Sequence, residues 1–162
     1  MGHLAGKNIA VTGAGNGIGR AIALACADEG ANVVVADYGV SMEGSNPSSK
    51  VADAVVAEIE MAGGTAVAVA GDVSDMEVGQ YIVDTAVDAW GTIDGVVCVA
   101  GIVRERMLFN MTEEEFDHVV GVHLKGHFTL FKAASAVMRK QKSGGSLVGF
   151  TSGAFVASTA QA

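Results

Sequence analysis

The stretch NIAVTGAGNGIG, residues 8–19, decides the fold of this chain. Its first half is a short apolar run closed by Gly13, which is typical of a strand that ends in a tight turn. Residues 18–30 follow with apolar positions at helical spacing, and Gly30 stands where a helix is expected to end. The stretch therefore predicts one strand, a glycine turn and one helix in direct succession.

The rest of the chain repeats this unit. Further strands are predicted over residues 31–37, 65–75, 93–101 and 146–152, and further helices over residues 49–64, 75–91 and 111–141. Ser48 or Ser49 is expected to cap the first of these helices, and Thr112 with Glu115 predicts a capping box at the start of the last. The order βαβαβαβαβ predicts an α/β fold, a Rossmann-type doubly wound parallel sheet with helices on both faces.

Composition limits the partners of this chain. Its 162 residues are long enough for one domain, and half of them are hydrophobic. A formal net charge of −8, with ten scattered Lys and Arg, argues against nucleic acid. Cys26 and Cys98 form no C-x-x-C pair, which fits a reducing cytoplasm. Neither a signal peptide nor a membrane span is predicted.

A dinucleotide site is predicted at the glycine turn. Gly13, Gly17 and Gly19 lie between a strand and a helix, where backbone N–H groups can face a pyrophosphate. Asp37 ends the next strand about twenty residues later, where a carboxylate would meet the ribose hydroxyls of an adenosine. The alternatives are an ordinary glycine turn and a solvated aspartate at a strand end.

The residues near Asp37 favour NAD as the cofactor over NADP. The carboxylate would repel a 2′-phosphate, and none of Ala14, Asn16 and Tyr38 supplies a basic group to attract one.

In order and spacing, these motifs resemble the classical short-chain dehydrogenase/reductase family, from about Lys7 to the last residue. The family's T-G-x-x-x-G-x-G nucleotide loop is matched by Gly13, Asn16, Gly17, Ile18 and Gly19. The resemblance implies that Asp72 and Val73 contact adenine. It also implies that the backbones of Ala100 and Gly101 lie beside the nicotinamide ribose.

Two segments resemble the family's catalytic motifs. VHLKGHF, residues 122–128, is similar to V-N-L-x-G-x-F, which implies that Val122 lies beside the cofactor and that His123 takes the place of the catalytic Asn. Ser152 takes the place of the serine that hydrogen-bonds the substrate oxygen. The alternatives are a helix histidine and a strand-closing serine without catalytic parts. No metal site is predicted, because no third ligand accompanies His123 and His127.

Besides His123, the sequence departs from the family at two further points. Val99 stands where the family usually has Asn, and no Tyr followed four residues later by Lys occurs in the ten residues after Ser152. That pair moves the hydroxyl proton during hydride transfer, because a nearby cation lowers the pKa of the phenol. We therefore expect this chain to bind cofactor without catalysing the reaction.

Two hypotheses about the whole protein follow. In the favoured one, residues 1–162 are a single NAD-binding domain, lacking the family's C-terminal strands and helices, of a longer NAD-dependent oxidoreductase. That protein would act on a small-molecule secondary alcohol or ketone in the cytoplasm, as a homo-oligomer. In the alternative, the chain is complete and binds a nucleotide or a partner without catalysis.

Overall fold

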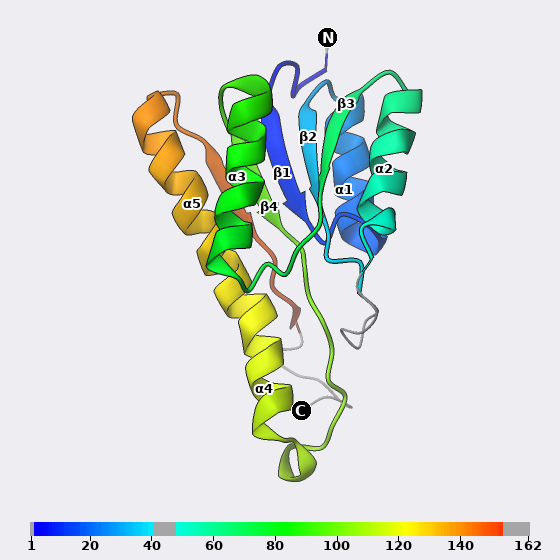
Figure 1. Ribbon diagram of the computed structural model, residues 1–162, viewed down its shortest axis with the longest axis vertical. Coiled ribbons are helices and arrows are strands. Elements are labelled where there is room, and N and C mark those ends of the chain that lie inside the picture. Colours follow the sequence, from blue (N-terminus) through cyan, green and yellow to red (C-terminus); the bar gives the residue numbers. More distant parts are fainter. Residues whose placement is uncertain (1, 41–47, 154–162) are drawn as a thin grey trace.

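The computed structural model describes residues 2–40 and 48–153, which form a five-stranded, fully parallel sheet (Figure 1). The strand order is β3-β2-β1-β4-β5. The strands are β1 (Asn8–Thr12), β2 (Asn32–Ala36), β3 (Thr65–Val69), β4 (Gly95–Cys98) and β5 (Ser146–Gly149). The predicted Rossmann-type α/β fold is confirmed.

Helices cover both faces of the sheet (Figure 1). One face carries α1 (Gly17–Asp28) and α2 (Lys50–Met61), and the other carries α3 (Met76–Trp90) and α5 (Gly126–Gln141). The segment before α5 extends past the sheet as η1 (Leu108–Asn110), α4 (Glu113–Val120) and η2 (Gly121–Lys125). This arrangement leaves the carboxyl ends of the strands beside the α4–α5 rod.

The predicted helix over residues 111–141 differs from the observed one at its centre. Gly121–Lys125 forms one turn of π-helix, so α4 and α5 are two segments of one rod. The capping box is confirmed, because Glu115 N–H donates to Thr112 Oγ1 and Thr112 N–H donates to Glu115 Oε2. The expected serine cap of α2 is wrong: Ser49 lies at the N-cap position, but its side chain makes no capping hydrogen bond.

Two hydrophobic cores lie on either side of the sheet. One forms between the sheet and α3 with α5, around Ile82, Val96 and Leu130. The other forms between the sheet and α1 with α2, around Val11 and Ile59. The central strands are buried on both faces, which accounts for their continuous apolar sequence. Cys98 lies in the first core, and burial raises the pKa of its thiol to about 12.

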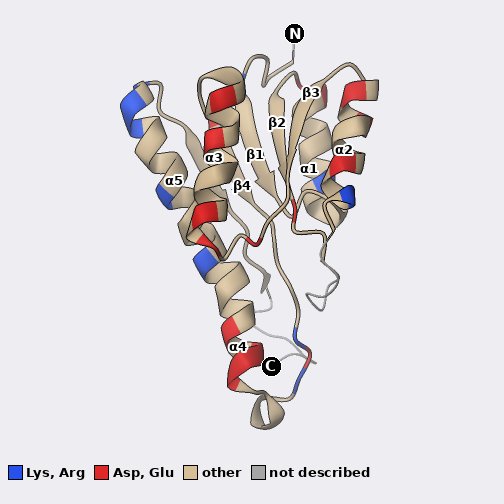
Figure 2. Ribbon diagram, in the orientation of Figure 1, with Lys and Arg blue, Asp and Glu red and all other residues tan. Residues whose placement is uncertain are grey.

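Charged residues occupy the outer surfaces of the helices. Asp and Glu lie along α2, α3 and α4, whereas Lys and Arg gather at the end of α5 and in the segment before α4 (Figure 2). Within the described ranges, no helix combines the length and the apolar character needed to cross a membrane.

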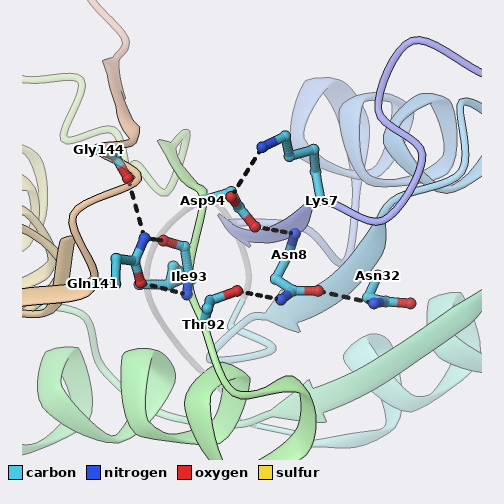
Figure 3. Close-up of polar contacts among 8 residues, drawn as sticks. All are labelled: Lys7, Asn8, Asn32, Thr92, Ile93, Asp94, Gln141 and Gly144. Atoms are coloured by element: carbon cyan, nitrogen blue, oxygen red, sulfur yellow. Dashed lines mark hydrogen bonds and ion pairs between the residues drawn. The ribbon is translucent and has the colours of Figure 1, made fainter.

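A side-chain network ties the amino-terminal ends of three strands together (Figure 3). The buried Asn8 of β1 donates from Nδ2 to Thr92 Oγ1 at 2.8 Å, and its Oδ1 accepts from Asn32 Nδ2 at 2.8 Å. Asp94, just before β4, accepts from Asn8 N–H at 3.0 Å and from Lys7 Nζ at 3.1 Å. The network therefore joins β2, β1 and β4 at their amino-terminal ends.

We expect Asn8→Ala to lower the free energy of unfolding by about 2 kcal/mol, because it removes two side-chain hydrogen bonds and leaves partners without them. Urea denaturation measures this loss. Gln80→Ala is the matched control, since it removes an exposed bond to Asp84 on α3. Equal denaturation midpoints for both variants would contradict the role given to Asn8.

Candidate functional site

A cleft of about 660 Å³ opens at the carboxyl ends of β1 and β4. These two strands are neighbours in the sheet, yet the chain continues from β1 to β2 on one side and from β4 to β5 on the other. Open α/β sheets bind ligands at such a switch point. The cleft is lined by every residue predicted to bind the cofactor, namely Gly13, Asn16, Gly17, Ile18, Gly19, Asp37, Asp72, Val73, Ala100, Gly101 and Val122.

At two positions of the glycine turn, a side chain would collide with neighbouring backbone. Gly13 has a φ of +64°, and a Cβ there would lie 2.8 Å from Ala100 Cα. A Cβ on Gly19 would lie 2.1 Å from the carbonyl oxygen of Gly13. The side chain of Asn16, at the N-cap of α1, makes no capping hydrogen bond. The first N–H groups of α1 therefore face the cleft without this partner, as an anion site requires.

Asp37 is held at the end of β2 by two backbone amides. Gly15 N–H donates to Oδ2 at 2.8 Å, and Gly39 N–H donates to Oδ1 at 2.6 Å. In the part of the chain that the structure describes, no Lys or Arg lies within 4 Å of this carboxylate. Each oxygen keeps a further lone pair, so the carboxylate can still accept hydrogen bonds from a ligand.

Thr12, the last residue of β1, organises the end of β4. Its Oγ1 accepts from Val99 N–H at 3.2 Å and from Ala100 N–H at 3.3 Å. Val99 also packs against the core formed with α1 and α2. The backbone between β4 and Gly101 is thus positioned without the asparagine that the family usually has at residue 99.

Asp72 and Val73 follow β3 and are fixed to α5. The buried Thr129 donates from Oγ1 to the carbonyl oxygen of Val73 at 2.7 Å, and Asp72 Oδ1 accepts from Ser74 N–H at 2.8 Å. A Cβ on Gly126 would lie 2.8 Å from Val73 Cγ2. The segment that carries the predicted adenine contacts is therefore held by Thr129 of α5 and by the close approach of α5 at Gly126.

The π-turn brings Val122 and His123 to the cleft. His123 Nε2 lies 3.2 Å from the Ile102 nitrogen and 2.8 Å from the Ile102 carbonyl oxygen. The imidazole contacts Gly101, where a Cβ would lie 2.5 Å from Cε1. Among residues 2–40 and 48–153 no group of three potential metal ligands occurs. His123 thus holds the loop after β4, and its catalytic part stays a prediction.

Ser152 is not among the described residues that line the cleft. β5 ends at Gly149, three residues earlier than the predicted strand, and Ser152 is exposed beyond it. Residues 154–162 lie outside the described part of the chain. The role of Ser152 therefore remains a prediction from the resemblance.

The structure adds lining residues that sequence reasoning missed, among them Tyr38, Val40, Val103 and His118. His118 lies one helical turn before Val122, and this spacing could have indicated that both side chains lie on the face of the rod that lines the cleft. Its Nδ1 accepts from Arg104 Nη2 at 2.9 Å, because a guanidinium only donates. The sequence carried no signal for this contact, which joins a loop to a helix.

The glycine turn at the switch point and the strand-end carboxylate define the class of dinucleotide-binding α/β proteins. Comparison with known sequences gives the family. Residues 7–161 match the short chain dehydrogenase family, and the chain belongs to it. This confirms the resemblance.

The relatives include dehydrogenases and multifunctional enzymes. The chain is 46% identical over 149 residues to the hydroxyacyl-CoA dehydrogenase ChsB1 of Mycobacterium tuberculosis, covering 90% of this chain and 45% of that one. It is 45% identical over 139 residues to mouse peroxisomal multifunctional enzyme type 2, covering 86% of this chain and 18% of the enzyme.

A solved structure agrees with the fold. The crystal structure of a short chain dehydrogenase from Mycobacterium avium aligns with a TM-score of 0.79 and 49% identity, covering 91% of this chain and 51% of that one. This chain thus spans about half of the length of that protein, or less in the multifunctional enzyme.

We expect Gly19→Ala to cost about 3 kcal/mol or more in the free energy of unfolding, because its Cβ would collide with backbone. Gly17→Ala is the matched control. Gly17 has a φ of +52° but open space around it, so only backbone strain of about 1–2 kcal/mol is expected. Urea denaturation of both variants compares them, and equal losses would contradict the close packing of α1 on the turn.

Proposed function

We propose that this chain binds NAD in the cleft and supplies the cofactor-binding part of an oxidoreductase. That enzyme would transfer a hydride between nicotinamide and the carbinol carbon of a secondary alcohol, or its ketone. The observation that carries the proposal is Asp37, fixed by Gly15 and Gly39 in a wall of the cleft without a nearby cation. A carboxylate in this position favours two ribose hydroxyls and disfavours a 2′-phosphate.

The other cofactor contacts follow from the order of elements along the cleft. Adenosine would lie between Asp37 and the Asp72–Val73 segment, and the pyrophosphate would face the first amides of α1. Nicotinamide ribose would lie against Ala100 and Gly101. When bound, the nicotinamide supplies hydride chemistry, and these residues bind and orient it.

The proton that accompanies hydride transfer needs its own acceptor. We propose that Ser152 hydrogen-bonds the substrate oxygen and that His123 orders the loop beneath the nicotinamide. Neither replaces the Tyr and Lys pair of the family, which does not follow Ser152 in these 162 residues. We therefore expect NAD binding without oxidation of a secondary alcohol by this chain alone, and measurable oxidation would contradict that expectation.

The names of relatives narrow the substrate of the whole protein. One relative is a hydroxyacyl-CoA dehydrogenase, which favours a hydroxyacyl thioester among secondary alcohols. The free cysteines Cys26 and Cys98 favour a reducing compartment, and we propose the cytoplasm. Some relatives are named as peroxisomal enzymes.

We also propose that the whole protein forms a homo-oligomer through the α4–α5 rod. Phe116, Leu124 and Phe128 are each more than half exposed on this rod. Exposed apolar side chains of this size favour an interface between subunits.

Asp37→Asn tests the cofactor assignment. The wild-type chain is expected to bind NAD at least tenfold more tightly than NADP, and the variant should lose most of this preference because the repelling charge is gone. Fluorescence or calorimetric titration with both cofactors gives the ratio of the NADP dissociation constant to the NAD dissociation constant. A change in folding alters this ratio less than it alters either affinity. Asp88→Asn, on the exposed side of α3, should keep the wild-type ratio. Tighter binding of NADP by the wild type would overturn the assignment.

A further inference from the structure

His123 and His127 lie four residues apart on the α4–α5 rod, but their rings reach different strands. His123 Nε2 contacts the backbone of Ile102, after β4, whereas His127 Nε2 accepts from the Phe150 N–H, after β5, at 3.2 Å. The pair therefore does not converge on one ligand. Each ring instead holds the backbone where one strand leaves the sheet.

His127 supplies a hydrogen-bond acceptor to the first backbone amide beyond the end of the β4–β5 ladder. The β4–β5 ladder ends with Cys98 paired to Gly149, so Phe150 is the first residue beyond it. An N–H group at this place needs an acceptor outside the ladder. Nε2 of an imidazole accepts only while it carries no proton, so the bond also sets the tautomer of His127.

The ring of His127 is held in this orientation by its neighbours. Phe131 meets it edge-on, with ring centroids 5.8 Å apart and an interplanar angle of 82°. Gly149 leaves room on the strand side, because a Cβ there would lie 3.1 Å from His127 Cδ2. The acceptor nitrogen is therefore aimed at β5 by packing as well as by the hydrogen bond.

We propose that His127 is a positioning residue that fixes the exit of the chain from β5 and thereby the place of Ser152. This inference rests on the proposed function, in which Ser152 meets the substrate oxygen. Ser152 follows Phe150 by two residues and lies outside the ladder, so the direction of the chain at Phe150 limits where the hydroxyl can lie.

The same rod then positions both sides of the reaction centre. His123, in the π-turn, holds the loop on the nicotinamide side, and His127, in the first turn of α5, holds the serine side. A shift of the rod would move both contacts together. The distance between the cofactor loop and the serine is therefore less sensitive to such a shift than either position alone.

Amide hydrogen exchange, measured by NMR on the full 162-residue chain, tests the proposal. His127→Leu replaces the imidazole with an apolar side chain of similar size that has no acceptor, and should speed exchange at the Phe150 amide roughly fivefold or more. His127→Gln presents an acceptor oxygen at a similar reach and should restore protection. Amides of β1 serve as the control and should exchange as in the wild type in both variants.

Ser152 itself gives the second measurement. The ¹⁵N order parameters of Thr151 and Ser152 should fall in His127→Leu and recover in His127→Gln, which a role in packing alone would not produce. Unchanged exchange at Phe150 in His127→Leu would overturn the proposal, as would no rescue by Gln. It would also be overturned if Phe150 lost protection while the order of Ser152 stayed the same.

Titration of the same variants with NAD separates this inference from the proposed function. His127 does not line the cleft, so both variants should bind NAD within about twofold of the wild type. Failure of the wild type to bind NAD would contradict the proposed function, while a change of exchange at Phe150 in the His127 variants would still support the positioning role of His127. NAD binding with an unresponsive Phe150 would sink the positioning role alone.

Discussion

The close approach of the glycine turn to the end of β4 is the constraint on which the rest of the site depends. A Cβ on Gly13 would lie 2.8 Å from Ala100, and one on Gly19 would lie 2.1 Å from the Gly13 carbonyl oxygen. Thr12 joins the same two strands by accepting from two amides of the β4 end. Because these contacts fix α1 against β1 and β4 together, the helix N-terminus and the loop after β4 face one cleft.

The amino-terminal and carboxyl ends of the strands use their hydrogen-bonding groups in opposite ways. At the amino-terminal edge, Asn8, Asn32 and Asp94 satisfy one another, and no described buried side-chain polar atom lacks a partner. At the carboxyl edge, the first amides of α1 are left without a side-chain cap. The satisfied amino-terminal end stabilises the sheet, whereas the carboxyl end would offer donors to the proposed ligand, so stability and binding would be separated along the same strands.

Much of the fold could be predicted because its signals are local. The glycine spacing, the strand-end Asp37 and the Thr112–Glu115 capping box each depend on residues close in sequence, and the structure places them as expected. The π-turn at Gly121–Lys125 could not be predicted, because the contact of His123 with Ile102 that accompanies it comes from a distant loop. The Arg104–His118 contact was missed for the same reason. Predicted strands extended too far at their carboxyl ends: β3 and β4 give way to segments that line the cleft, and β5 ends at Gly149.

The groups that line the cleft explain how an acidic chain could bind the proposed anionic cofactor. The chain carries a net charge of −8, and the described residues that line the cleft include no Lys or Arg. A pyrophosphate would therefore be bound by neutral N–H dipoles at the start of α1, which act within the first turn and require no cation. Asp37 and Asp72 can then lie in the same cleft, because in the proposed binding mode the acceptors would meet the ribose and adenine end and the donors the phosphate end. In that binding mode, selectivity would come from the position of each group and not from the net charge of the chain.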